Sequence, residues 1–126
     1  MSETIVVPQS AINWFEIPCE DLDRATNFYE NLLGRKMNRE SLGDPMAIFA
    51  CDQKGTTGTL VKRTFQKPGG NGTMVYLNCD NLDEVIARVP AAGGLILMPK
   101  TEVPGGFGHF ACLRDSEGNH VGLHSH

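Results

Sequence analysis

The sequence lacks the features that define several large classes of protein. It has no apolar run long enough to span a membrane, and no basic segment ahead of an apolar one that would act as a secretory signal. It also has no Lys/Arg cluster, and its formal net charge is −4, so we expect no binding to nucleic acid or anionic membranes. No two cysteines form a C-x-x-C pair, which argues against a zinc knuckle or a thioredoxin-like motif. We therefore expect a cytoplasmic protein whose four cysteines are buried thiols: Cys19, Cys51, Cys79 and Cys112.

An internal repeat runs through the 126 residues of the chain, a length that suits one domain. Four residues of the first half recur 60 positions later as the same residue types: Cys19, Leu22, Asp23 and Gly34 recur as Cys79, Leu82, Asp83 and Gly94. The tripeptide Phe49-Ala50-Cys51 recurs 61 positions later as Phe110-Ala111-Cys112. A nearly constant offset indicates two copies of one unit. We predict modules at about 11–66 and 73–126, joined by the Pro/Gly-rich linker 67–72.

Each copy has the residue pattern of a β-α-β-β-β unit. Aromatic and branched residues predict strands, and apolar residues at helical spacing predict one helix per copy. In the first copy we expect a strand at 11–17, a helix at 21–34 and strands at 46–51 and 58–61. In the second copy we expect a strand at 73–78, a helix from 82 that Pro90 to Gly94 ends, and strands at 95–98, 109–113 and 120–124. One helix covers only one face of such a sheet, so the other face must curve into a cavity or meet another surface.

The opening of the chain resembles that of the vicinal oxygen chelate superfamily, which includes glyoxalases, bleomycin resistance proteins and extradiol dioxygenases. The shared motifs are a strand, a D-L-x-x-A helix start and an F-Y-x-x-x-L-G helix end, found here as 12–18, 21–25 and 28–34. The segment 114–119 resembles the closing D-P-x-G-N turn of the family, with Ser116 in place of Pro. The resemblance implies an α+β domain of two repeated βαβββ modules that form a curved mixed sheet around a cavity. Its members include metal-dependent enzymes and proteins that only bind antibiotics, so the fold alone does not choose a function.

The metal ligands of the family are missing at the matching positions. Metal-dependent members carry His, Glu or Gln on the first and last strand of each module. Here these positions fall on Trp14, Met74 and Gly122, and near Thr59. Tryptophan and glycine offer no ligand, and methionine suits only soft ions such as copper(I). We therefore expect no metal and no other cofactor, and the resemblance leaves it open whether the protein is an enzyme.

Strand alternation gives the candidate site residues, because every second side chain points to the same face. If Trp14 faces the cavity, Glu16 does too. By the same rule, Tyr76 and Asn78 lie on the same face as Met74. On the last strand, His120 and His124 lie on the same face as Gly122. Trp14 offers a stacking surface or is ordinary core.

Glu16 is the candidate catalytic residue. In an apolar pocket its pKa would be raised, so that it could act as a general acid or base, and at a rim it would be a solvated carboxylate. His109 follows the Gly-rich segment 104–108, which forms either a flap over the pocket or a simple hairpin.

The main hypothesis is a metal-free protein that binds a small, partly apolar molecule against Trp14, Met74 and Tyr76. Glu16, Asn78 and a histidine would be its polar anchors. Two alternatives remain at this point. One is a metal-dependent lyase, isomerase or dioxygenase with atypical ligands such as Glu16 and His120; the other is a protein-interaction module. We also expect a homodimer, because one face of the sheet needs cover.

Overall fold

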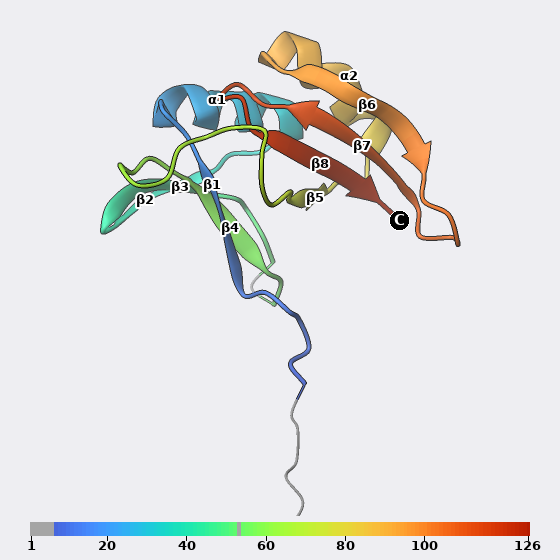
Figure 1. Cartoon of the computed structure of the whole chain (residues 1–126), viewed down its shortest axis with the longest axis horizontal. Coiled ribbons are helices and arrows are strands. Elements are labelled where there is room, and N and C mark those ends of the chain that lie inside the picture. Colours follow the sequence, from blue (N-terminus) through green and yellow to red (C-terminus); the bar gives the residue numbers. More distant parts are fainter. Residues whose placement is uncertain (1–6, 53) are drawn as a thin grey trace, which may run out of the picture.

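The computed structural model of the protein describes residues 7–52 and 54–126. The chain forms two modules with the same β-α-β-β-β order, coloured blue to green and yellow to red in Figure 1. The first module consists of β1 (Trp14–Pro18), α1 (Leu22–Leu33), β2 (Asn38–Leu42), β3 (Asp44–Ile48) and β4 (Thr57–Val61). The second consists of β5 (Tyr76–Asn78), α2 (Leu82–Ala92), β6 (Leu95–Glu102), β7 (His109–Arg114) and β8 (His120–Ser125). The predicted α+β class and the duplication are therefore confirmed.

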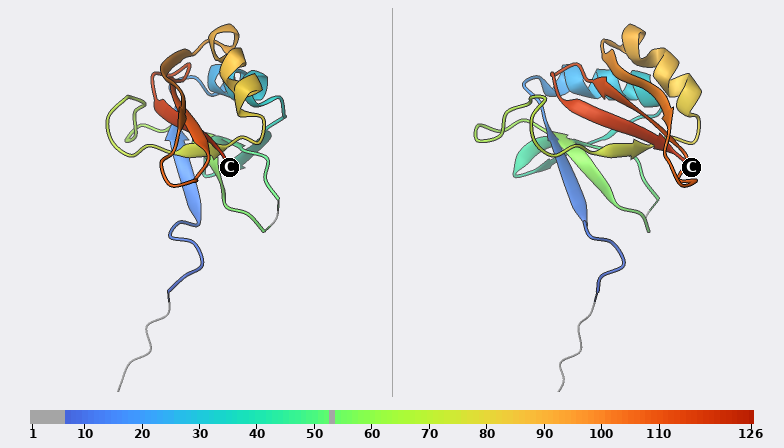
Figure 2. Two further views of the ribbon diagram at one scale, coloured as in Figure 1. Left: turned by 90° about the vertical axis from the view of Figure 1, so that its right-hand side faces the viewer. Right: turned by 45° about the vertical axis from the view of Figure 1, so that its right-hand side comes forward.

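Each module builds its own four-stranded mixed sheet. The strand order is β1-β4-β3-β2 in the first sheet and β5-β8-β7-β6 in the second. In both sheets the first strand of the module runs parallel to the last strand, and the other pairs are antiparallel. Within the described residues no ladder joins β1 to β5, so the expected curved surface consists of two sheets at an angle to one another (Figure 1). Both helices lie on the same side of the sheets (Figures 1 and 2), which leaves the opposite faces uncovered by helices.

Helix α1 begins and ends where its sequence predicts. The Asp21 side chain accepts a 3.0 Å hydrogen bond from the Arg24 backbone N–H, as an N-cap residue does. Gly34 adopts the left-handed conformation with φ 71°, and its N–H donates to the Glu30 carbonyl. Most of the predicted apolar stripe is buried, and its last residue, Leu33, is partly buried. The buried residues are Leu22, Ala25, Phe28, Tyr29 and Leu32.

Helix α2 ends at Ala92, within the segment Pro90 to Gly94 where its end was predicted. Pro90 lies in the last turn of the helix, and Gly93 ends the helix in the left-handed conformation with φ 109°. Proline costs one backbone hydrogen bond there, and the Gly93 and Gly94 N–H groups donate to the carbonyls of Pro90 and Val89. Neither helix of the described part of the chain is long and apolar enough to cross a membrane.

A buried turn at 115–119 ties the second module to the first. Asp115 is 3% exposed and accepts a 2.7 Å hydrogen bond from the Tyr29 hydroxyl of α1. The carboxylate also accepts the backbone N–H of Asn119, whose side-chain amide donates to the Pro18 carbonyl at 2.8 Å. Buried polar groups are stable only when paired in this way. The turn that resembles the family's closing motif therefore joins α1 and the end of β1 to β8.

Two expectations about the first module are wrong in detail. The strand β2 was not predicted, because all five of its residues are exposed and its sequence, NRESL, has no apolar alternation. The strand predicted at 46–51 is β3, which ends at Ile48. Cys51 consequently lies in an exposed loop, and only Cys19, Cys79 and Cys112 are buried. All four cysteines are free thiols.

Candidate functional site

Four of the predicted site residues line one cavity between the two modules. The cavity has a volume of about 610 Å³, and its walls come from β1 and from the segment that leads into β5. The predicted residues in it are Trp14, Glu16, Met74 and Tyr76; Ile12, Phe15, Thr56, Thr73 and Val75 complete the wall. Residues of both halves of the chain thus share one hollow.

Alternation along β1 explains why Trp14 and Glu16 face this hollow. Ile17 and Cys19 are buried in the core cluster beneath the helices. Successive side chains of a strand point to opposite faces, so Trp14 and Glu16 belong to the face away from the helices. Trp14 remains 40% exposed, and its indole N–H lies 3.4 Å from a Glu16 carboxylate oxygen.

On the opposite wall, the Tyr76 ring packs directly against Gly122. The two residues are partners in the register of β5 and β8, and a Cβ at position 122 would overlap the Tyr76 ring. The ring also packs edge-on against Phe110, with 6.2 Å between the centroids. Partial burial and the neighbouring Cys112 thiol raise the pKa of Tyr76, so its hydroxyl stays neutral and can donate a hydrogen bond.

Glu16 is not isolated in an apolar pocket, because Arg63 binds it from the side. The guanidinium Nη1 lies 2.5 Å from Glu16 Oε1, and Nη2 lies 3.3 Å from Oε2. Arg63 is only 13% exposed, and hydrogen bonding by Glu16 raises its pKa against the opposing effect of burial. Arg63 Nε lies 3.3 Å from Asp44 but makes no hydrogen bond of good geometry. The guanidinium also stacks 5.3 Å above the Phe65 ring, so Glu16 is held in a fixed place.

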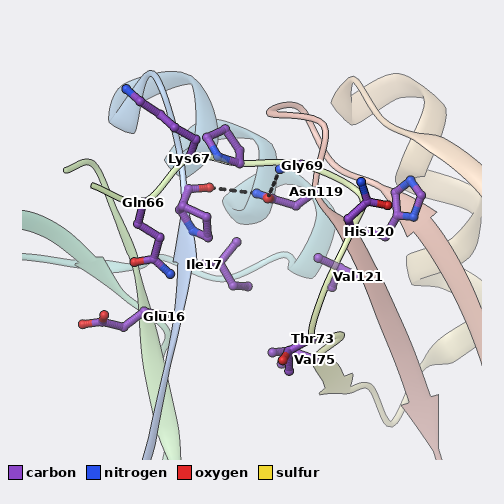
Figure 3. A pocket seen from close by; sticks show the side chains of 13 residues that line it. Glu16, Ile17, Gln66, Lys67, Gly69, Thr73, Val75, Asn119, His120 and Val121 are labelled. Carbon is purple, nitrogen blue, oxygen red and sulfur yellow. Dashed lines mark hydrogen bonds between the residues drawn. The ribbon is translucent and has the colours of Figure 1, made fainter. Parts of the chain in front are cut away.

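Figure 3 shows a second hollow, of about 490 Å³. It shares Glu16, Thr73 and Val75 with the first. The chain from Gln66 to Asn71 runs along its rim, and the Gly69 N–H donates to the Asn119 side chain at 3.0 Å. The predicted residue His120 also lines this second hollow. Its ring lies so close to Gly70 that a Cβ at position 70 would overlap it. Glu16 and His120 therefore border the same space, and in the part of the chain that the structure describes they belong to no cluster of three potential metal ligands.

Three predicted residues are not part of these two hollows. Asn78 and His124 are partners in the register of β5 and β8, and His124 Nε2 lies 2.7 Å from the Phe107 carbonyl. His109 lines a separate hollow of about 250 Å³ near the start of α2. The Gly-rich segment 104–108 joins β6 to β7 as a hairpin, and none of its residues lines the cavity of Trp14.

Sequence reasoning missed Arg63, Thr56 and Thr73. Arg63 follows β4 in a charged stretch that looks like ordinary surface sequence, and only its contact with Glu16 reveals its place at the site. The two threonines carry no pattern of their own. Their position depends on how the two modules pack.

Comparison with known proteins identifies the family. The model of the Glyoxalase/Bleomycin resistance protein/Dioxygenase superfamily matches residues 11–123, nearly the whole chain. The chain belongs to this superfamily. No curated protein matches it in sequence.

Several solved structures share the fold. A hypothetical protein of S. aureus superimposes with a TM-score of 0.70 at 25% identity, and the match covers 96% of each chain. A glyoxalase-related enzyme of Fulvimarina pelagi gives 0.68 at 18% identity over 94% of this chain and 89% of that one. A lactoylglutathione lyase of Agrobacterium tumefaciens gives 0.65 at 23% identity over 94% and 96%. At these identities the last two show the fold only.

The residues that the sequence resemblance matches to the family's metal ligands do not fit a divalent ion. Trp14 has no ligand atom, and the place of Gly122 is filled by the Tyr76 ring. The Thr59 hydroxyl is buried and lies 3.0 Å from the Ala47 carbonyl and 2.8 Å from the Leu60 carbonyl. Met74 offers only a thioether, a soft ligand. Throughout 7–52 and 54–126, no three His, Cys, Asp or Glu side chains cluster as a metal site would require.

Proposed function

We propose that the protein binds a small, partly apolar molecule in the 610 Å³ cavity and does so without a metal ion. The supporting observation is that Trp14, Met74 and Tyr76, from both modules, line one cavity of a size that suits a small ligand. Trp14 is 40% exposed and Tyr76 50% exposed, so their rings are open to a ligand. An aromatic wall of this kind favours a flat, partly apolar molecule.

Glu16 and the Tyr76 hydroxyl are the polar anchors in this proposal. Arg63 fixes the Glu16 carboxylate, which can accept a hydrogen bond from the ligand without losing its ion pair. The neutral Tyr76 hydroxyl can donate one. We therefore expect a ligand with a planar apolar part and a hydroxyl or amine group. His120 contributes only to a ligand long enough to extend into the second hollow.

A thermal shift screen in the presence of EDTA tests the proposal. Planar aromatic compounds that carry hydroxyl or amine groups should raise the Tm of the wild-type protein, because a ligand that binds the native state stabilises it. Trp14→Ala should weaken the binding of the best compound roughly 10-fold through loss of the stacking surface. The matched control is Phe107→Ala, which removes an exposed aromatic side chain outside the cavity. Equal weakening by both variants, or stabilisation that EDTA abolishes, would overturn the proposal.

We also propose that the protein forms a homodimer. The face of the second sheet away from the helices carries large exposed apolar side chains, among them Leu95 at 49% and Met98 at 42%. Apolar surface of this kind is costly in water and favours a partner. Light scattering at micromolar concentration should give twice the mass of 13.8 kDa. A monomer at all concentrations would refute the dimer without affecting the cavity.

A further inference from the structure

Two histidines at the end of β8 lie side by side in a way that the cavity does not use. His124 belongs to β8, and His126 follows it after one residue. Residues two apart on an extended chain point to the same face. Their rings are indeed neighbours, with 4.6 Å between the centroids and an angle of 86° between the planes.

The hydrogen bond of His124 determines which nitrogen is free. Its Nε2 lies 2.7 Å from the Phe107 carbonyl oxygen. A carbonyl oxygen only accepts hydrogen bonds, so Nε2 carries the proton and donates. In the neutral ring Nδ1 then keeps its lone pair. A metal-binding histidine typically donates its other N–H to a backbone carbonyl, which fixes the ring and its tautomer.

The distance between the two rings suits coordination of one ion. A ligand nitrogen lies about 2.1 Å from such a metal, and the ring centroid lies about 1.1 Å farther along the same line. Two rings at 90° around one ion would then have centroids about 4.5 Å apart, and at a tetrahedral angle about 5.2 Å apart. The observed 4.6 Å lies within this range of separations. Among divalent first-row ions, Ni²⁺ and Cu²⁺ rank high in affinity and suit imidazole ligands.

We propose that His124 and His126 form a binding site for a divalent transition metal ion, Cu²⁺ or Ni²⁺, separate from the cavity of Trp14. Since no third His, Cys, Asp or Glu joins a cluster in the described ranges, water completes the coordination. Such a site exchanges its metal readily. The site does not depend on the proposed ligand, and the family's metal positions have no part in it.

Copper titration of the untagged protein tests this site, since a polyhistidine tag would bind the same ions. All samples carry Cys51→Ser, because the exposed Cys51 thiol also binds copper. Calorimetry measures stoichiometry and affinity, and electron paramagnetic resonance detects nitrogen ligands of Cu²⁺. The variants are His124→Ala and His126→Ala. His120→Ala is the matched control, because it removes an exposed histidine of the same strand and face.

We expect one Cu²⁺ per chain with a two-nitrogen signal. Each variant of the pair should weaken binding at least 10-fold and leave one nitrogen, and His120→Ala should leave both readings unchanged. His126 lies beyond the end of β8 and is exposed, so its variant keeps the fold. Three results would overturn the site: no binding, loss of affinity in only one variant of the pair, or equal loss in the control.

Discussion

The carboxylate of Glu117 joins the two modules, and removing its charge should destabilise the fold in a pH-dependent way. The side chain is 1% exposed and lies in the turn of the second module. It accepts the backbone N–H groups of Glu20 and Asp21 at the start of α1, at 2.9 and 3.0 Å. It also pairs with the Arg24 guanidinium through two hydrogen bonds of 2.6 and 2.9 Å. A charged acceptor at a helix N-terminus is favourable, so the contact stabilises both α1 and the module pair.

The size of the effect follows from the pKa of Glu117. Burial alone would raise it, but the hydrogen bonds from Arg24, Asp21, Glu20 and Ser116 lower it from 4.5 to about 2. A shift of this size corresponds to about 3 kcal/mol of folding free energy. Arg24 is half in solvent, which screens the pair, so we expect about 2 kcal/mol. Because the folded pKa is depressed, this stability is complete above pH 4.5 and is lost as the pH falls toward 2.

Urea unfolding of wild type and Glu117→Gln from pH 7 to pH 2.5 measures this contribution. The variant keeps the size of the side chain but lacks the charge, so it should be less stable by about 2 kcal/mol at pH 7. The difference between the two proteins should shrink below pH 4.5. Glu102→Gln, at an exposed position of β6, is the control and should change little. A constant difference at every pH, or no difference at pH 7, would refute the reasoning.

Three further predictions concern other parts of the molecule. Gly122→Ala should displace the Tyr76 ring and lower the free energy of unfolding by about 1–3 kcal/mol, measured by urea unfolding. Unchanged stability and ligand affinity would contradict the close packing of Tyr76 against Gly122. Tyr29→Phe should cost about 1–3 kcal/mol, because the buried Asp115 carboxylate loses a partner; a neutral change would contradict it. In the folded protein a thiol reagent at pH 8 should modify Cys51 first, since burial raises the pKa of Cys19 and of Cys79 to about 11; early modification of either buried thiol by mass spectrometry would contradict this.

Most of the fold could be predicted because it depends on local patterns that repeat. The apolar stripe and caps of α1 lie within one stretch of sequence, and the repeat supplies the plan of the second module. The strand β2 escaped prediction because an exposed edge strand needs no apolar alternation. Cys51 looked buried because it lies in an apolar stretch, yet the chain leaves the sheet at Ile48 and exposes it.

The candidate site could be predicted only where strand alternation determines it. Trp14 and Glu16 share a face because both lie on β1. Alternation does not hold on the opposite wall, where Thr73, Met74 and Val75 precede β5 and line the cavity together with Tyr76. The partner of Glu16 could not be predicted, because Arg63 reaches it across 47 residues of sequence. His124 was predicted at the same site, but it does not line the cavity of Trp14, and its Nε2 lies 2.7 Å from the Phe107 carbonyl.

Fluorescence of Trp14, the only tryptophan of the chain, tests the central claim most directly. The metal-stripped protein is titrated with the compound that raises the Tm most in the screen. A ligand stacked on the indole should change the emission in a saturable way, with the same dissociation constant as calorimetry gives. Thermal stabilisation without any change in Trp14 emission, or a change that requires added metal, would contradict a metal-free site at this tryptophan.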